Sequence, residues 1–454
     1  MTVPSFDLLL EDVDALTPSG RERVDIAVAA GRIVAIDAAL GALGRRTTRQ
    51  RLRLSGATAL PGVIDSHVHF REPGRETVED LESGSRGAIL GGVTSVIDMP
   101  NTAPPVVDAA SVVDRRERAL GRVHCDYGFY VGADGANTEL LAALEQLPGV
   151  LGTKLFMTAS TTGMRVSEDA AIAAVLASGK RPVAVHAEDH DRISQRASIV
   201  EASADVRDHP RWRDAESALL ATTRLLALAR TAGRLVHVLH VSTAAELAPL
   251  IDAKPLASFE VLPQHLTFAA PEVYERYGAL AQMNPPIRGA ADQGALWQAV
   301  RDGSVDTLGS DHGPHSLAEK ALAYPNMHAG MPGVQTLLPV MLTHVAAGLL
   351  TLERLVDLTS AGPARIWNLA GKGRIAPGYD ADFSIVDLAA ERRIDNRWIA
   401  AKVGWTIYDG MRARGWPLAT ILRGRLVMRD GEVLGEPSGR LLRAHGQASE
   451  MAPT

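Results

Sequence analysis

The chain of 454 residues has almost no cysteine, no marked excess of charge of one sign and no long apolar run. Its single cysteine, Cys125, cannot build an internal disulfide framework, which favours a reducing compartment, the cytoplasm. Lysines and arginines number 47 and acids 53, for a net charge of −6. This near balance, on the acidic side, argues against nucleic acid or an anionic membrane as the main partner.

Membrane-spanning and secretory patterns are missing as well. No apolar run reaches the roughly 20 residues that a transmembrane helix needs. The first 16 residues mix acids with leucines and have no basic region, so we expect no signal peptide. Hydrophobic residues make up 46 % of the chain, enough for a sizeable core, and the length allows one large domain with a smaller one beside it.

Between residues 58 and 370, short β-rich runs alternate with helical patterns. The strand candidates are Ala59–Val68, Thr94–Met99, His124–Val131, Gly152–Met157, Pro182–Ala187, Leu235–Val241, Ser258–Leu262 and Asp306–Ser310. The helix candidates are Glu79–Leu90, Thr138–Leu147, Glu168–Ala177, Ala215–Ala232, Ala244–Ala253 and Gly294–Arg301. Strands that alternate with helices predict a parallel sheet, and eight such units predict an α/β fold, the closed (β/α)8 TIM barrel.

The two flanks, residues 1–57 and 371–440, follow a different pattern. Both contain short strand candidates joined by turn signals, namely Phe6–Leu10, Val24–Ala29, Arg32–Asp37, Asp382–Val386, Ala419–Leu422 and Arg425–Met428. Neither flank buries much apolar surface alone, so we expect both to meet in one small β-sandwich domain beside the barrel. The tail, residues 441–454, is rich in small residues, and we expect it to be frayed and flexible.

His67 and His69 stand at the end of the apolar run that begins at Leu60. Side chains alternate along an extended strand, so these two imidazoles point to the same side. Neutral imidazole is a common zinc ligand, and the pair is therefore half of a candidate metal site. Taken alone, the motif also fits two ordinary histidines near a surface turn.

Other chemically active residues stand at the ends of later strand candidates: Lys154 on the fourth, His186 on the fifth, His240 on the sixth and Asp311 on the eighth. Each has an ordinary alternative, since the lysine could be a strand-end charge, the histidines could be satisfied core residues and the aspartate could cap a turn. In a parallel barrel the active site lies at the C-terminal ends of the strands. Together with the histidine pair, they predict one shared site.

Four histidines, one aspartate and one lysine can hold two divalent metal ions, and Zn²⁺ suits this N/O set. An ammonium repels metal, so Lys154 must change state; carboxylation of its neutral amine gives a carbamate that can bridge two ions. Burial beside histidines favours that neutral amine. A metal-bridged hydroxide would attack a carbonyl, and Asp311 could pass its proton to a leaving nitrogen.

Several segments resemble motifs of the amidohydrolase superfamily, and within it of the dihydroorotases. Residues 67–74 resemble the HVHxREPG segment, residues 98–102 the MPNT turn and residues 310–315 the DHAPH segment. Lys154, in GTKLFM, matches the carboxylated-lysine version of the family. Residues 405–424 resemble the dihydroorotase domain of the large animal pyrimidine-synthesis polypeptide. The resemblance covers nearly the whole chain.

This resemblance implies reversible hydrolysis of the cyclic amide of L-dihydroorotate to N-carbamoyl-L-aspartate, a step of de novo pyrimidine biosynthesis. It assigns Arg71, Asn101 and His315 to the substrate carboxylate and Asn284 to the ring. A planar guanidinium is the preferred bidentate partner of a carboxylate. Arg71 follows His69 by two residues, so we expect it on the same side of the strand, at the mouth of the site.

Other interpretations stay open. A sister enzyme acting on allantoin or a hydantoin is the main alternative, and Arg71 is the feature that separates it from a dihydroorotase. A non-catalytic, dihydroorotase-like scaffold subunit is a third, although such proteins tend to lose ligands and this chain keeps all six. Arg71 could instead form a surface salt bridge with Glu72 or Glu76, and Asn101 could be a plain turn residue.

The loop after Lys154, residues 157–163, is small and polar, and we expect it to act as a lid. It contains no tyrosine, whereas hydantoinases commonly carry one there, which weighs against a hydantoinase. Three residues depart from the family pattern where histidine, alanine and glutamate are usual: Gln264, Gly313 and Gln335. None removes a metal ligand, but they change the surroundings of the site and put substrate preference in doubt.

The resemblance also implies a small-molecule substrate. Barrel enzymes of this size are commonly homodimers, so we expect a homodimer or a higher homo-oligomer. The sequence leaves open whether the chain associates with aspartate transcarbamoylase.

Overall fold

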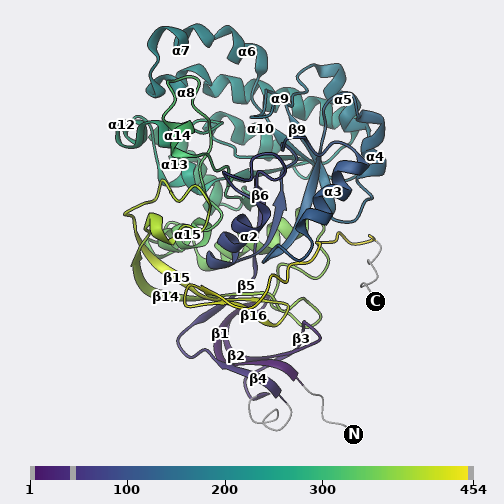
Figure 1. Cartoon of the computed structure of the whole chain (residues 1–454), viewed down its shortest axis with the longest axis vertical. Coiled ribbons are helices and arrows are strands. Elements are labelled where there is room, and N and C mark those ends of the chain that lie inside the picture. The colour runs from purple at the N-terminus through teal and green to yellow at the C-terminus, as the bar shows by residue number, and fades with distance from the viewer. Residues whose placement is uncertain (1–5, 41–47, 448–454) are drawn as a thin grey trace.

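The computed structural model describes residues 6–40 and 48–447. Its larger part is a barrel of eight parallel strands paired in chain order (Figure 1). The strands are β6 (Val63–Val68), β7 (Val93–Asp98), β8 (Asp126–Gly132), β9 (Val150–Phe156), β10 (Val183–His186), β11 (Val236–Val238), β12 (Ala257–Val261) and β13 (Thr307–Leu308). The predicted (β/α)8 barrel is confirmed.

The first and last barrel strands meet through few contacts. Strand β13 has only two residues, so the closure lies beyond its end, where Val68 forms a parallel bridge with His312. The backbone N–H of Ser310 also donates to Oδ1 of Asp65 at 3.1 Å. These contacts place the segment after β13 directly beside the histidine pair at the end of β6.

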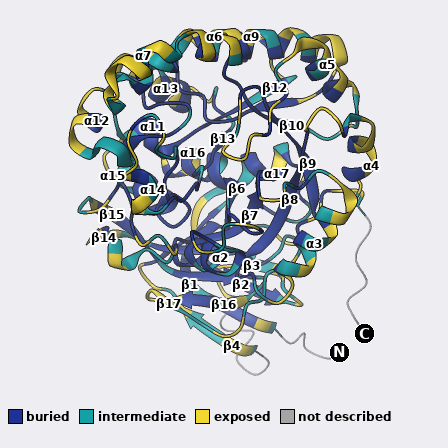
Figure 2. Ribbon diagram, turned by 45° about the horizontal axis from the view of Figure 1, so that its top comes forward, coloured by how far each residue is buried: buried dark blue, intermediate teal, exposed yellow. Residues whose placement is uncertain are grey.

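Helices surround the barrel, and their exposed residues lie on the outer side (Figure 2). The helices are α2 (Leu81–Leu90), α3 (Ala109–Ala119), α4 (Leu141–Leu144), α5 (Asp169–Ala177), α6 (His190–Gln195), α7 (Ala197–Ser203), α8 (His209–Trp212), α9 (Ala215–Ala232), α10 (Leu247–Asp252), α11 (Pro263–Thr267), α12 (Glu272–Tyr277), α13 (Ala290–Arg301), α14 (Leu317–Lys320), α15 (Leu337–Ala346), α16 (Leu352–Val356) and α17 (Gly362–Ile366). Helix α9 illustrates how local sequence sets the ends of a helix. The side chain of Asp214 caps its first turn by accepting from the Ser217 N–H, and Gly233 ends it with a φ of 64°.

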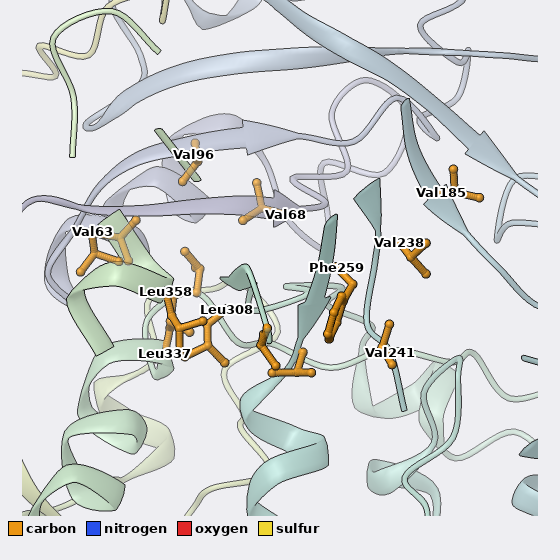
Figure 3. Close-up of a cluster of buried hydrophobic side chains, with 14 of the residues drawn as sticks. Val63, Val68, Val96, Val185, Val238, Val241, Phe259, Leu308, Leu337 and Leu358 are labelled. Carbon is orange, nitrogen blue, oxygen red and sulfur yellow. The ribbon is translucent and has the colours of Figure 1, made fainter. Parts of the chain in front are cut away.

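The barrel core consists mainly of valine and leucine side chains from the strands and inner helix faces. Figure 3 shows part of it: Val63 of β6, Leu308 of β13, and Leu337 and Leu358 from the helical layer belong to one buried cluster. All are at most 1 % exposed. Burial on both faces explains why these strands are continuous apolar runs in the sequence.

Both ends of the chain contribute to a second sheet of nine strands, seen below the barrel in Figure 1. Its strands are β1 (Phe6–Thr17), β2 (Gly20–Ala29), β3 (Arg32–Asp37), β4 (Thr48–Arg53), β5 (Thr58–Pro61), β14 (Phe383–Arg393), β15 (Arg412–Leu422), β16 (Arg425–Arg429) and β17 (Glu432–Val433). Most neighbours are antiparallel, but β4 and β5 run parallel to β1. This sheet has its own apolar core, and the predicted meeting of the two flanks is confirmed. The domain boundaries at 57 and 371 stay a prediction.

The structure divides the predicted strand Ala59–Val68 in two. Residues of β5 pair with β14 of the terminal sheet, while β6 begins the barrel. The break is at Gly62, where a Cβ would lie 2.2 Å from Oγ1 of Thr94, so a side chain cannot fit between the two sheets. The division changes the sheet to which the first half belongs, not the position of the histidine pair.

The tail, expected to be frayed and flexible over residues 441–454, is ordered in the part that the structure describes. Residues 441–447 lie against the barrel: Leu441 forms a bridge with Tyr127, and Leu442 is 2 % exposed. Its N–H donates to the Tyr127 carbonyl at 2.7 Å. Leucines among the small residues provide this anchor. The rest of the predicted tail, 448–454, lies outside the described residues.

A buried ion cluster joins the barrel to the terminal sheet. Nζ of Lys372 donates to Asp126 Oδ2 at 2.5 Å and to Asp382 Oδ2 at 2.6 Å, and Arg423 also pairs with Asp126. Asp126 begins β8 of the barrel, whereas Asp382 precedes β14 of the sheet.

None of the helices in the described ranges is long and apolar enough to cross a membrane.

Candidate active site

His67, His69 and Asp311 meet at the C-terminal end of the barrel. Nε2 of His67 is 3.1 Å from Oδ1 of Asp311, and Nε2 of His69 is 3.3 Å from the same oxygen. One ligand atom from each residue lies within 4.8 Å of the other two, a spacing that could hold a metal ion. The predicted convergence of the first and eighth strands at this site is therefore present in the structure.

The outer nitrogens of both imidazoles are held by acceptors. Nδ1 of His67 is 2.7 Å from Oε1 of Glu260, and Nδ1 of His69 is 2.7 Å from Oδ1 of Asn101. Because these oxygens accept, an N–H of each ring is on Nδ1, and Nε2 is the nitrogen directed at Asp311. An imidazole fixed in this way presents its free nitrogen to a cation.

The charge balance around His67 also fits a cation. Although burial lowers the pKa of His67, Glu260 and Asp311 raise it to about 9. Burial would raise the pKa of Asp311, but His67 and His69 hold it well below its usual value. Two carboxylates thus draw positive charge to this point, and a divalent cation would serve in place of the proton.

Lys154 enters the same space from β9. It is completely buried, and its Nζ has no hydrogen-bond partner among the described residues. The nitrogen lies 4.4 Å from the centroid of the Phe156 ring. Burial lowers the pKa of Lys154 to about 7, so a large share of the amine is neutral at pH 7. An unpartnered, partly neutral amine beside a carboxylate and histidines fits the predicted carbamate.

His186 and His240 complete the histidine cluster. Their ring centroids lie 4.6 Å apart, and that of His240 lies 5.4 Å from that of His67. Burial is the first cause that lowers the pKa of both below the usual value, which makes them neutral, the metal-binding form. Nε2 of His186 is 2.7 Å from Oε2 of Glu188, so the structure turns that nitrogen toward a carboxylate.

One cavity of about 60 Å³ collects most of the predicted site residues. Its lining includes His67, His69, Arg71, Asn101, Lys154, His186, His240, Asn284 and Asp311. His315 is not part of the lining, but it lies directly behind Arg71. The loop predicted as a lid contributes Ala159, Ser160 and Thr161 to the wall. The strand ends and loops that carry these residues are far apart in sequence and close in space.

Arg71 is 6 % exposed and has φ of 58°, a left-handed conformation that is unusual for a side chain of this size. Its Nη2 is 3.2 Å from Nε2 of His315, and its Nε donates to the Pro314 carbonyl at 3.3 Å. Over the described ranges no carboxylate pairs with it within 4.0 Å, so the alternative salt bridge with Glu72 or Glu76 is absent there. Among the described residues, no carboxylate forms an ion pair with this buried guanidinium beside the cavity.

Asn101 and Asn284 have defined partners. The Asn101 amide nitrogen donates to Oγ1 of Thr161 at 3.2 Å, which ties the strand end to the lid loop. Nε2 of His209 is 2.9 Å from Oδ1 of Asn284 and 3.1 Å from the Met283 carbonyl. His209 therefore directs the amide oxygen of Asn284 toward itself and the N–H₂ group away.

Four residues around the site were not predicted from the sequence: Glu260, Glu188, His209 and Lys320. A glutamate within the apolar strand candidate Ser258–Leu262 was the one available signal, because an acid inside a buried strand requires a partner. Glu188, two residues after His186, also binds Arg213, whose Nε donates at 3.1 Å. The contacts of His209 depend on a loop 75 residues away, which no local pattern shows.

The three departures from the family motifs lie at different distances from the chemistry. Gly313 lines the cavity, and a Cβ there would lie 3.3 Å from Nη2 of Arg71. The Gln264 amide donates to the Ser310 carbonyl at 2.8 Å, just before Asp311. Gln335 donates to the Trp398 carbonyl at 2.6 Å, away from the cavity lining.

A second group of metal-ligand type, His315, Glu319 and His328, lies behind Arg71. Arg71 approaches one ring nitrogen of His315, and Arg75 lies 3.5 Å from the other. Arg75 also pairs with Glu319. Two guanidiniums at this distance oppose the binding of a cation by this group.

Comparison with known proteins gives a consistent family. The Amidohydrolase family matches residues 58–427. The dihydroorotase of Methanothermobacter thermautotrophicus is 33 % identical over 451 residues, covering 98 % of this chain and all of that protein. The allantoinase of Deinococcus radiodurans is 34 % identical over 455 residues, 97 % of this chain and 99 % of that one.

A solved structure agrees with these relatives. The L-hydantoinase (dihydropyrimidinase) from Arthrobacter aurescens superposes with a TM-score of 0.91 at 28 % identity, covering 96 % of this chain and 99 % of that chain. The matched region contains the barrel and every residue of the cavity. The chain belongs to the amidohydrolase family.

Proposed function

We propose that the chain is a dihydroorotase, which hydrolyses the cyclic amide of L-dihydroorotate to N-carbamoyl-L-aspartate and catalyses the reverse ring closure. The reaction adds water across one ring amide: the C–N bond breaks, oxygen joins the carbonyl carbon and the nitrogen gains a proton. The family provides cyclic-amide hydrolysis, and the residues of the cavity support this particular ring.

Arg71 is the observation that carries the choice of substrate. It is a buried guanidinium at the wall of the cavity that lacks an anionic partner over the described ranges. Burying an unpaired charge is costly, so a substrate carboxylate is its natural complement. Dihydroorotate carries such a carboxylate on its ring, whereas the rings of allantoin and the simple hydantoins do not. His315 beside Arg71, and Asn101 across the cavity, would complete the carboxylate site.

The metal ligands in this proposal are His67, His69, Lys154 as its carbamate, His186, His240 and Asp311. Two divalent ions, Zn²⁺ by the donor set, would supply an activated water and polarise the amide carbonyl. Asp311 Oδ1, between two imidazoles, is placed to accept a proton at the cavity and return it to the leaving nitrogen. Asn284 is placed to donate its amide N–H to the ring.

Allantoinase is the second candidate, because a relative of that name is as similar to this chain as the dihydroorotases. The cavity has Arg71 in its wall and no tyrosine among its described lining residues, which supports a small anionic ring over a hydantoin with a bulky substituent. The third candidate, a scaffold without activity, predicts weak metal binding. Less than one tightly held ion per purified chain would support it.

The direct test is product identification. Zinc-loaded protein incubated with L-dihydroorotate should form N-carbamoyl-L-aspartate, detected by mass, and the same protein should form dihydroorotate from N-carbamoyl-L-aspartate at lower pH. Absence of both products from protein that holds its metal ions would contradict the proposal.

A further inference from the structure

The side chain of Lys320, at the end of α14, holds two separate segments of backbone. Its Nζ donates to the carbonyls of Gln282 at 2.9 Å, His328 at 3.0 Å and Gly330 at 3.1 Å. The lysine is 1 % exposed. It is therefore a buried tether between residues 282–284 and residues 328–330.

Both tethered segments form part of the cavity wall. Asn284 lines it from one segment, and Ala329 and Gly330 line it from the other. A direct bond joins the two, since the Gly330 N–H donates to the Gln282 carbonyl at 3.0 Å. A shift of either segment would change the shape of the space between Asn284 and the metal-ligating residues.

The contacts require the charged form of the lysine. Three carbonyl oxygens only accept, and an ammonium has three N–H donors whereas a neutral amine has two. Burial lowers the pKa of Lys320 to about 7, so the ammonium with three donors predominates below neutral pH. The neighbouring Glu319 is taken by Arg75, so backbone carbonyls alone hold the ammonium over the described ranges.

We infer that Lys320 is a positioning residue for substrate: its ammonium fixes the wall that carries Asn284 without touching substrate or metal. The inference rests on the proposed function for the role of Asn284. It predicts a division of effects, because a displaced binding wall weakens substrate binding while the metal ligands and Asp311 stay in place.

Lys320→Met keeps the length and removes the charge and all three donors. We expect KM to rise about tenfold or more while kcat stays within about threefold, the pattern of lost binding rather than lost chemistry. Metal content should equal that of the wild type. The matched control is Lys254→Met: Lys254 donates to the Ser304 carbonyl at 2.6 Å and to Asp306 at 2.9 Å, away from the cavity lining, and should leave KM unchanged. An unchanged KM in Lys320→Met would overturn the inference.

Two further measurements separate this inference from the proposed function. Hydrogen exchange of peptides covering 282–284 and 328–331 needs no substrate, and it should be faster in Lys320→Met than in wild type and in Lys254→Met. Equal exchange overturns the tether, whatever the enzyme acts on. In Lys320→Ala, n-propylammonium replaces the missing atoms and should lower the raised KM; no response to it, with a folded protein, would likewise count against the role of the ammonium.

Discussion

Nη2 of Arg71 lies 3.2 Å from Nε2 of His315, and both side chains are buried: Arg71 in the wall of the cavity that holds the histidine cluster, and His315 behind Arg71. Burial lowers the pKa of Arg71 to about 10, so the guanidinium is still charged at neutral pH. The pKa of His315 lies well below its usual value, because of burial and the arginine beside it, so the imidazole is neutral. The pair therefore presents one positive charge for which the described residues provide no ion-pair partner.

Arg71→Met should weaken catalysis on anionic rings selectively. Loss of charged hydrogen bonds to a carboxylate costs about 2–3 kcal/mol, which lowers kcat/KM for dihydroorotate about 30- to 150-fold. A neutral ring such as hydantoin does not use the guanidinium, so any turnover of it should change less than about threefold. Steady-state kinetics with both compounds tests this, and equal losses on the two would refute a carboxylate-specific role.

Asp311→Asn should abolish turnover in both directions. The substitution keeps the shape but removes a charge between His67 and His69, and with it the proposed proton acceptor. Loss of a general base typically costs 10²–10⁴-fold, and a lost metal contact adds to it. Rates of hydrolysis and of ring closure should fall together. A variant that retains a tenth of the activity with full metal content would exclude the proton-transfer role.

Carboxylation of Lys154 should depend on pH in a way that an exposed lysine does not. Carbon dioxide reacts with the neutral amine, and burial lowers the pKa of Lys154 to about 7. At fixed dissolved ¹³CO₂, the initial rate of carbamate formation on metal-free protein should therefore rise through pH 7 and level off near pH 8, because that rate follows the fraction of neutral amine. An ordinary lysine would still be gaining reactivity at pH 10, so continued growth of the rate to that pH would contradict the buried, activated amine.

Lys372→Met should destabilise the junction of the barrel and the terminal sheet. It leaves the buried Asp126 and Asp382 without their shared cation, and breaking a buried pair by removing one partner costs about 3–5 kcal/mol. Burial alone would lower the pKa of Lys372, but these carboxylates raise it above its usual value. The stabilisation is thus present throughout neutral pH and is lost only as pH rises far into the alkaline range.

Urea unfolding with two variants measures this effect. The half-exposed Lys254 pairs with Asp306, and its replacement by methionine should cost about 1 kcal/mol or less. If Lys372→Met lowers the free energy of unfolding by no more than Lys254→Met does, the junction does not depend on the buried cluster.

Much of the fold followed from local patterns. The predicted range Arg32–Asp37 and the predicted helix Ala215–Ala232 coincide with β3 and α9, because alternating and helical periodicities were clear and turn or cap residues bounded them. Strand β4 and helix α3 were not predicted. Strand β4 (Thr48–Arg53) is polar and is held by parallel pairing with β1, so its sequence has little apolar signal.

In the candidate site too, residues at strand ends were predictable, whereas residues that act through distant contacts were not. Strand-end positions brought His67 and Asp311 together in the prediction, since the C-terminal ends of barrel strands meet whatever the loops do. Glu260, which orients His67, and Lys320, which ties two loops, could not be assigned in this way. Their roles depend on contacts over 193 residues of sequence for Glu260 and 38 for Lys320. Such contacts come from tertiary packing rather than from spacing.

We propose that Arg71 makes this amidohydrolase select a carboxylate-bearing ring. The most direct test of this proposal is a parallel measurement of kcat/KM for L-dihydroorotate, hydantoin and allantoin with one zinc-loaded preparation. We expect kcat/KM for dihydroorotate to exceed that for either neutral ring by about 100-fold or more, which corresponds to one charged contact that only the anion makes. A kcat/KM for allantoin or hydantoin equal to or above that for dihydroorotate would contradict it.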